Sequence, residues 1–295
     1  MTDRVAVIEA RGLRKTFGRI VALDGIDLRV EEGRILGLVG PNGAGKTTAL
    51  NAILGLTHYQ GELKVLGRDP WTERDRLMLD ASFIADVAVL PRWMRVWQAL
   101  DYMAGVHPRF DRARAEGFLE KTTIQRRSKV RELSKGMVTQ LHLALVMAID
   151  AKLLVLDEPT LGLDILFRKQ FFDSLLNDYL DRSRTVVVAT HQVEEIQDVL
   201  TDLMFIERGR IVLACGIDEF ESRYLEVTVN PEHVAAARAL GPMHERLVFG
   251  RTVLLFDGAD HDRLAALGEV RRPGIADVFV AVMGDGTAAA QGTRR

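Results

Sequence analysis

Nine consecutive residues, 40–48, have the sequence Gly-Pro-Asn-Gly-Ala-Gly-Lys-Thr-Thr, which matches the spacing of a phosphate-binding loop. Glycines let successive backbone N–H groups curl around phosphate oxygens, and a following helix adds the positive end of its dipole. An apolar run at 34–39 precedes the loop and a helical segment at 48–56 follows it. The residues predicted to contact a nucleotide here are Gly40, Asn42, Gly43, Gly45, Lys46, Thr47 and Thr48. The alternative, a chance glycine turn, is disfavoured by this strand–loop–helix context.

Two carboxylates, Asp157 and Glu158, end a second apolar run at 152–157. One carboxylate is needed to hold Mg²⁺, directly or through water, and a second can polarise an attacking water. Lys46 would then reach the β- and γ-phosphates, and Thr47 would ligate the metal. A strand that ends in Asp-Glu is common by itself. Together with a phosphate-binding loop, it predicts Mg²⁺-dependent hydrolysis of a nucleoside triphosphate.

Three further motifs follow in a characteristic order. They are Leu-Ser-Lys-Gly-Met at 133–137, Leu-Gly-Leu-Asp at 161–164, and His191 after the apolar run at 185–189. With the loop and the paired carboxylates, this set resembles the nucleotide-binding subunit of an ATP-binding-cassette (ABC) transporter over roughly residues 5–215. The form LSKGM, in place of the commoner LSGGQ, is similar to bacterial subunits that serve a separately encoded exporter-type permease. The segment at 273–280 resembles the same branch more weakly.

This resemblance implies a role for each matching residue. Glu158 would be the general base, and His191 would sense the γ-phosphate, although a lone histidine is more often structural. Ser134 and Gly136 would contact the γ-phosphate of ATP held on the phosphate-binding loop of a second copy, so that two copies enclose two Mg-ATP. Asp164 would belong to the loop that links the two sites. The implied cofactors are ATP and Mg²⁺.

Some positions match the family pattern less closely. Phe17 would stack on adenine, and an ordinary half-buried phenylalanine explains it nearly as well. The family's metal-sensing glutamine aligns with Asp86, whose shorter carboxylate is expected to contact Mg²⁺ through water. Lys135 replaces a glycine of the signature, and Leu161 replaces a serine, which removes one inter-subunit hydrogen bond. These departures allow slow turnover, and the catalytic carboxylate is still present.

Apolar runs alternate with helical segments, which predicts an α/β fold around a mainly parallel sheet. The predicted strands of this part are 5–8, 26–30, 34–39, 152–157, 185–189 and 211–214, and the predicted helices are 48–56, 165–180 and 193–200. The resemblance adds an antiparallel β subdomain to this P-loop core. The predicted domains are a nucleotide-binding domain at 1–217 with a helical insert at about 87–150, a small accessory α+β domain at 218–284, and a disordered tail at 285–295.

Composition bounds the partners and the compartment. Of 295 residues, 39 are Lys or Arg and 41 are Asp or Glu, so the chain as a whole is not built to bind nucleic acid. The single cysteine, Cys215, excludes an internal disulfide, and the N-terminus lacks the apolar core of a signal peptide. We therefore expect a cytoplasmic chain, peripheral on the cytosolic face of the inner (plasma) membrane through its permease. The alternatives are a soluble ABC-type ATPase acting on nucleic acid or ribosomes, and a regulator that dimerises on ATP.

Aromatic residues and a basic run mark the helical insert. The aromatic residues are Trp93, Trp97, Tyr102, Phe110 and Phe118. They form either the core of that subdomain or a groove that anchors a permease helix, since aromatic side chains dominate interfaces. The basic run at 126–131 is either a solvated face or a contact to an acidic partner.

Overall fold

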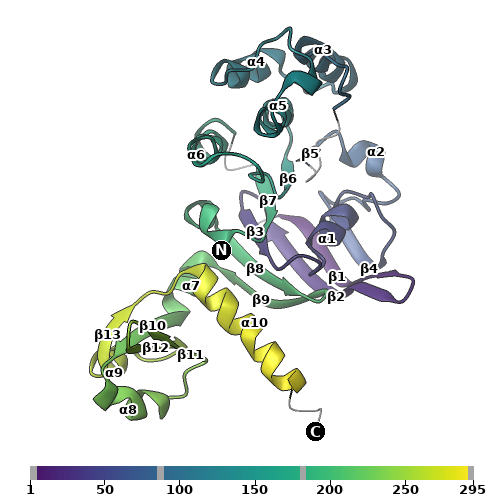
Figure 1. Ribbon diagram of the computed structural model, residues 1–295. Coiled ribbons are helices and arrows are strands. Elements are labelled where there is room, and N and C mark those ends of the chain that lie inside the picture. Colours follow the sequence, from purple (N-terminus) through teal and green to yellow (C-terminus); the bar gives the residue numbers. More distant parts are fainter. Residues whose placement is uncertain (1–4, 85–89, 180–183, 292–295) are drawn as a thin grey trace.

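The computed structural model describes residues 5–84, 90–179 and 184–291 (Figure 1). Within these ranges a six-stranded sheet has the order β5-β6-β7-β3-β8-β9. Its strands are β5 Ala81–Ile84, β6 Leu153–Asp157, β7 Thr185–Thr190, β3 Ile35–Val39, β8 Asp202–Glu207 and β9 Arg210–Gly216. The first five are parallel, and β9 returns antiparallel to β8. The predicted mainly parallel sheet is therefore present.

A second sheet, of order β2-β1-β4, is antiparallel and lies beside helix α1. Its strands are β1 Ala6–Phe17, β2 Ile20–Glu31 and β4 Gln60–Val65, and α1 is Lys46–Ile53. Ile8, Leu13 and Leu23 are fully buried, in one apolar cluster with residues of α1 and of the six-stranded sheet. The predicted strands at 5–8 and 26–30 are parts of a much longer hairpin.

The helical insert contains α3 Val96–Val106, α4 Arg112–Glu120 and α5 Lys135–Met147. These helices pack on one another around Leu100, Leu141 and Ala144, in a core of their own. A short helix, α2 Arg74–Leu77, precedes β5. The helical subdomain occupies one end of the molecule, and Figure 1 shows it at the top.

One buried carboxylate ties three parts of the fold together. Asp80, just before β5, is 6% exposed and accepts hydrogen bonds from Arg109, in the loop between α3 and α4, at 2.6 Å and from Arg68, after β4, at 3.1 Å. Burial raises the pKa of Asp80, but these guanidinium groups and Lys152 outweigh it and hold the pKa below its ordinary value. Asp80 therefore anchors the helical subdomain to the sheets.

Two segments after β6 differ from the predicted helices. The predicted helix at 165–180 is present as α6 Ile165–Ser174, continued by a π-turn at Leu175–Tyr179. The prediction of a helix at 193–200 is wrong, because this segment forms two separate 3₁₀ turns, Val193–Glu195 and Gln197–Val199. Val193 and Ile196 are both buried in the core, and Ile196 leaves the helical range at φ −121°. Packing of this short connection overrides its helical spacing.

The remaining residues form a small antiparallel sheet with helices, of strand order β11-β12-β10-β13. The elements are α7 Ile217–Arg223, β10 Tyr224–Val229, α8 Val234–Arg238, β11 His244–Val248, β12 Arg251–Asp257, α9 His261–Ala265, β13 Gly268–Arg271 and α10 Ile275–Gln291. They lie at the opposite end of the molecule from the helical subdomain (Figure 1). The domain boundary at 217/218 stays a prediction.

Helix α10 corrects the predicted tail. It packs against the six-stranded sheet, with Phe279 edge-on to Phe205 at a centroid distance of 5.1 Å, and it continues to Gln291. Residues 285–291 are therefore helical rather than disordered, because three consecutive alanines at 288–290 favour continuation of the helix despite two nearby glycines. Residues 292–295 lie outside the described ranges. No helix in those ranges is long and apolar enough to cross a bilayer.

Candidate functional site

The phosphate-binding loop lies where buried strand β3 passes directly into α1 (Figure 1). Gly45 has φ +112°, and a Cβ there would lie 2.5 Å from the carbonyl oxygen of Ala22, so only glycine fits. The N–H groups of the first helical turn have no intrahelical partner and face the end of the helix. The loop therefore combines unpaired donors with the positive end of the helix dipole.

Lys46, the first residue of α1, is 6% exposed. Its Nζ donates to the carbonyl oxygens of Gly40 at 2.7 Å and Pro41 at 3.4 Å, both in its own loop. The same Nζ lies 3.5 Å from Oε1 of Glu158. The cation thus spans the loop and reaches the end of β6.

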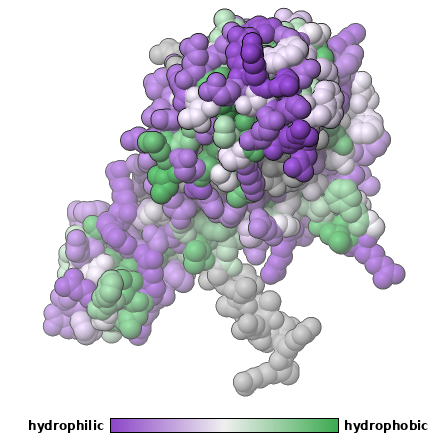
Figure 2. Space-filling view, turned by 45° about the horizontal axis from the view of Figure 1, so that its top comes forward, coloured by the Kyte–Doolittle hydropathy of each residue, from purple (hydrophilic) through white to green (hydrophobic). Residues whose placement is uncertain are grey.

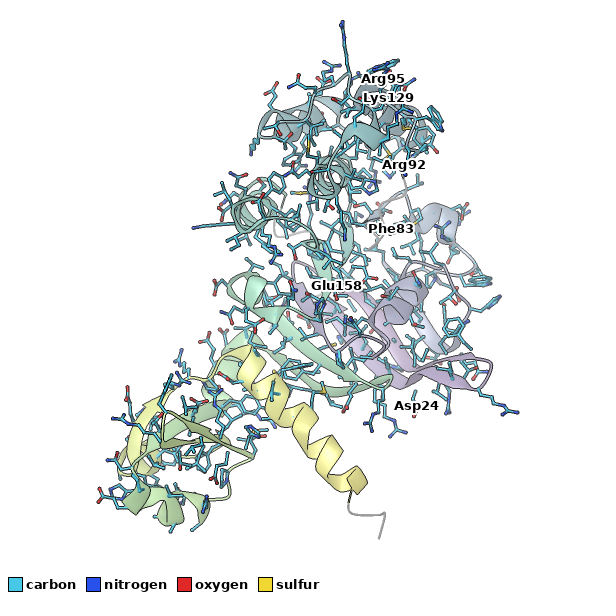
Figure 3. The ribbon with its side chains drawn as sticks, in the orientation of Figure 1. Asp24, Phe83, Arg92, Arg95, Lys129 and Glu158 are labelled. Carbon is cyan, nitrogen blue, oxygen red and sulfur yellow. The ribbon has the colours of Figure 1, made fainter. Side chains whose placement is uncertain are left out.

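Glu158 follows directly after β6 and is held in an unusual backbone conformation, with φ +47°. Its side chain is 13% exposed and makes two hydrogen-bond contacts, one with the last residue of β7 and one with the residue that follows it. Thr190 Oγ1 donates to Oε2 at 3.2 Å, and His191 Nδ1 lies 2.8 Å from Oε1. Figure 3 shows Glu158 near the centre of the molecule. The three residues predicted to be catalytic, Lys46, Glu158 and His191, therefore meet at one point.

A cleft of about 220 Å³ opens between this point and the β1–β2 hairpin. Its lining residues are Ile20, Val21, Ala22, Pro41, Asn42, Gly43, Gly45, Lys46, Thr47, Thr48 and Glu158. Of the predicted loop residues only Gly40 is missing from this wall, and its carbonyl instead holds Lys46.

Sequence reasoning missed Ile20 and Val21. They are 70% and 42% exposed although apolar, and both line the cleft. Phe17, predicted to stack on adenine, is 52% exposed and pairs with Ile20 across the hairpin, but it does not line the described cleft. Lys15 Nζ instead lies 4.8 Å from the centre of its ring.

The predicted Mg²⁺ ligands are direct chain neighbours of the predicted catalytic residues. Thr47 follows Lys46, and Asp157 precedes Glu158. Thr47 lines the cleft, and Asp157 is buried at the end of β6. Within the described ranges no group of three or more His, Cys, Asp or Glu side chains could hold a metal by itself. One hydroxyl and one carboxylate suit Mg²⁺, which is usually held through few protein oxygens and the phosphates of a substrate. Asp86, the third predicted ligand, lies outside the described residues.

The signature residues lie elsewhere. Ser134 caps α5, where its Oγ accepts from the N–H of Met137 at 3.2 Å, and Asp164 caps α6 in the same way through Phe167 at 2.8 Å. Both are exposed. A Cβ on Gly136 would lie 3.2 Å from the carbonyl oxygen of Gly162, so the two motifs are neighbours. None of these residues lines the cleft around Lys46, as far as the structure describes it.

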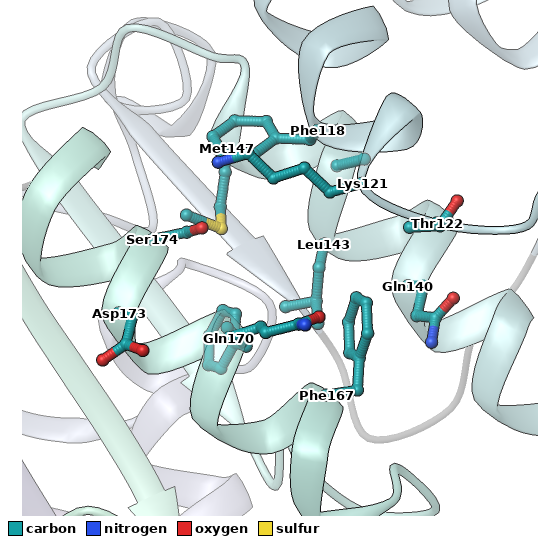
Figure 4. A pocket seen from close by; sticks show the side chains of 12 residues that line it. Phe118, Lys121, Thr122, Gln140, Leu143, Met147, Phe167, Gln170, Asp173 and Ser174 are labelled. Carbon is teal, nitrogen blue, oxygen red and sulfur yellow. The ribbon is translucent and has the colours of Figure 1, made fainter.

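The aromatic residues of the helical subdomain divide into two groups. Phe118 faces a cavity of about 300 Å³ between α4, α5 and α6 (Figure 4) and packs against two core clusters. Trp93, Trp97 and Tyr102 are 67%, 38% and 58% exposed. Phe118 therefore belongs to the core, whereas the tryptophans and Tyr102 face outward.

Comparison with known proteins identifies related chains. The family model described as "ABC transporter" matches residues 23–161. The chain is 30% identical to the daunorubicin resistance ATP-binding protein DrrA3 of Streptomyces coeruleorubidus, over 97% of this chain and 98% of that one. It is 31% identical to the Nod factor export ATP-binding protein I of Paraburkholderia xenovorans (strain LB400), over 95% and 97% of the two chains.

Solved structures are similar in fold. An ATP-binding subunit of an ABC transporter superposes with a TM-score of 0.66 at 22% identity, covering 73% of this chain and 92% of that one. A nucleotide-free ATP-binding cassette from an ABC transporter superposes with a TM-score of 0.62 at 20% identity, covering 72% and 92%. The fold predicted from the sequence motifs is confirmed.

Proposed function

Because the chain belongs to the ATP-binding subunits of ABC transporters, and is therefore an ATPase that powers transport, we propose that two copies enclose two Mg-ATP and drive a separately encoded export permease. One observation carries this proposal. Lys46 and Glu158 line the cleft and His191 contacts Glu158, whereas Ser134 and Gly136 are not among the described residues that line it. A site that needs the signature residues must take them from another copy.

Each residue of the cleft has a chemical task in this proposal. Lys46 binds the β- and γ-phosphates, and the loop N–H groups surround them. Thr47 and Asp157 would hold Mg²⁺, which neutralises phosphate charge when bound. Glu158 accepts the proton of the attacking water, and His191 donates toward the γ-phosphate. Ile20 and Val21 of the β1–β2 hairpin contact the base.

The Glu158→Gln variant tests the dimer. The amide keeps the shape of the side chain but cannot accept a proton, so turnover falls by about 10²–10⁴-fold. ATP still binds, and the closed dimer accumulates because hydrolysis no longer ends it. Steady-state turnover, and the dimer fraction in size-exclusion chromatography with ATP and with ADP, measure both effects.

Glu62→Gln is the matched control for this experiment, because Glu62 lies exposed on β4, away from the cleft. It keeps turnover and shows no ATP-trapped dimer. Normal turnover of Glu158→Gln contradicts its role as the base. Lost turnover without an ATP-dependent dimer contradicts the two-copy site and favours one completed by another partner.

The permease is the second part of the proposal. The relatives named above are a drug-resistance protein and a Nod factor export protein, which supports export but identifies no cargo. Exposed Trp97 and Tyr102 on α3 are the proposed docking residues. Co-purification of tagged chain with a multi-span membrane protein, and its loss in a Trp97→Ala/Tyr102→Ala variant that still hydrolyses ATP, test this contact. A dimeric ATPase that co-purifies with ribosomes or DNA instead contradicts it.

A further inference from the structure

A basic face lies at the outer end of the helical subdomain, formed by residues 91–97 and 125–132. These segments contain Arg92, Arg95, Arg126, Arg127, Lys129 and Arg131, and Glu132 is their single acidic residue. The whole chain has an excess of acidic residues, so this is a strong local asymmetry. Figure 3 shows Arg92, Arg95 and Lys129 together at this end, and Figure 2 shows mostly hydrophilic side chains there.

The backbone holds the two segments side by side. Four N–H to carbonyl hydrogen bonds of 2.9 to 3.0 Å join them, from Arg131 to Arg92, Val130 to Met94, Val96 to Ser128, and Trp97 to Arg126. Met94, Val96 and Val130 point into the subdomain core, since they are 9% exposed or less. The basic face is therefore a fixed surface rather than a loose run of charges.

Among the described residues, most of these cations have no carboxylate partner. Arg126 pairs with Glu116 at 3.1 Å, and Glu132 accepts from the N–H of Lys129. In the part of the chain that the structure describes, no carboxylate lies within 4.0 Å of the charged groups of Arg92, Arg127 or Arg131. Trp93, between Arg92 and Met94, is 67% exposed. Free guanidinium groups around an exposed indole require an explanation.

We propose that the basic face contacts the anionic headgroups of the lipid bilayer directly, beside the permease. Lys and Arg near a membrane surface attract acidic lipids, and tryptophan partitions into the headgroup region. Basic side chains with an exposed indole are the composition of a surface that lies on a bilayer. This inference rests on the proposed function, because a permease holds the chain next to a bilayer. An acidic protein segment would also suit the cations, and the experiments below distinguish it from a lipid surface.

The full-length chain without permease tests the proposal. It is sedimented with vesicles of phosphatidylcholine alone and with vesicles in which part of the lipid is phosphatidylglycerol. We expect binding only to the anionic vesicles, weakening as salt screens the charges. Arg127→Gln/Arg131→Gln lowers the partition coefficient about 25-fold, since each basic residue contributes about fivefold. Arg251→Gln, at an exposed arginine of the distant β11–β12 hairpin, is the matched control and leaves it unchanged.

Trp93 gives an independent measurement. In a Trp71→Phe/Trp97→Phe background, the remaining fluorescence of Trp93 is quenched by brominated lipid in anionic vesicles only. Absence of binding, equal binding to both kinds of vesicle, or equal loss in Arg251→Gln overturns the proposal. The proposal is also overturned if the Arg127→Gln/Arg131→Gln variant binds vesicles normally but no longer co-purifies with the permease. That result would identify an acidic protein segment as the partner of the basic face. Tighter binding to duplex DNA than to anionic vesicles also overturns it. The ATP-dependent dimer is measured separately, so failure here leaves the proposed function standing.

Discussion

The candidate site has two halves whose residues are bonded in different ways. The loop half contains the phosphate-binding loop at 40–48 with Glu158, Thr190 and His191, and the signature half contains residues 133–137. In the loop half, buried Lys46 contacts Glu158, whose side chain is 13% exposed, and Thr190 at the end of β7 and His191 just after it bond to Glu158. In the signature half, Ser134 is exposed, and the hydrogen bond that its Oγ accepts from the N–H of Met137 caps its own helix, α5. Gly136 neighbours Gly162 but no residue of the cleft.

This difference indicates that the two halves of the site have different functions. Charged residues that pair with one another are held in place before any ligand binds. Enzymes use such preorganised groups to stabilise developing charge without reorganisation. An exposed serine at a helix N-terminus instead offers a hydroxyl and unpaired N–H groups to whatever approaches it. In the proposed function, the first half acts on phosphate, and the second half, supplied by another copy, contacts the same phosphate.

The largest effect is expected in the loop half. Lys46→Ala removes the one side-chain cation found among the described residues of the cleft wall, so turnover falls by about 10³-fold and ATP binding weakens strongly. Steady-state hydrolysis and nucleotide titration measure this, with circular dichroism to show that the fold persists. Lys64→Ala, at an exposed lysine of β4, is the control and retains full activity. A folded Lys46→Ala protein with normal turnover would break the comparison.

The signature half is tested by two cap variants of the same kind. Ser134→Ala and Asp111→Ala each remove an N-cap bond, at α5 and at α4, and each lowers the free energy of unfolding by about 1 kcal/mol. Ser134→Ala alone also lowers turnover, by about 10²-fold, and reduces the ATP-dependent dimer. Urea denaturation and hydrolysis are measured on both. Equal activity of the two variants would show that Ser134 is only a helix cap.

A smaller effect on kcat is expected from Thr190, and it tests whether the loop half is preorganised. Thr190 is 2% exposed, and its hydroxyl positions Oε2 of Glu158. Thr190→Val removes this bond and lowers kcat about tenfold with little change in KM, because a hydrogen bond to a charged group is lost. Thr190→Ser keeps the hydroxyl and restores kcat. If Ser and Val behave alike, the effect comes from packing of the methyl group.

The smallest effect on turnover is expected where the two halves are joined. Asp80→Asn weakens the contacts to Arg109 and Arg68 and lowers the free energy of unfolding by about 2 kcal/mol at neutral pH. Because the pKa of Asp80 is lowered by folding, its contribution is complete above the unfolded pKa of about 4 and is lost as pH falls through the folded pKa. Urea titrations of wild type and variant should therefore converge in acid. Asp262→Asn, at a fully exposed carboxylate, shows no such difference.

The sequence predicted the loop half well, because its chemistry lies in continuous motifs. Local sequence alone is enough to recognise the loop at 40–48 and the pair Asp157–Glu158. Each follows a strand of the parallel sheet, so the fold brings them together. Ile20 and Val21 were missed because their role depends on a hairpin whose neighbours are distant in the chain. Strand β8, a buried run after a turn, was also missed, since nothing in its composition says that it pairs with β3. Asp80 was missed for the same reason, as all its partners are remote.

In the proposed function, the Glu158 carboxylate and the phosphates of the nucleotide compete for the same cation, the ammonium group of Lys46. The Nζ of Lys46 lies 3.5 Å from the Glu158 carboxylate. When phosphate oxygens take Lys46, the carboxylate loses a counter-charge and its oxygen becomes available to a water molecule. In the proposed function, Glu158 is thus released as the base when a nucleotide binds, and a nucleotide whose phosphates fail to engage Lys46 would leave the carboxylate paired.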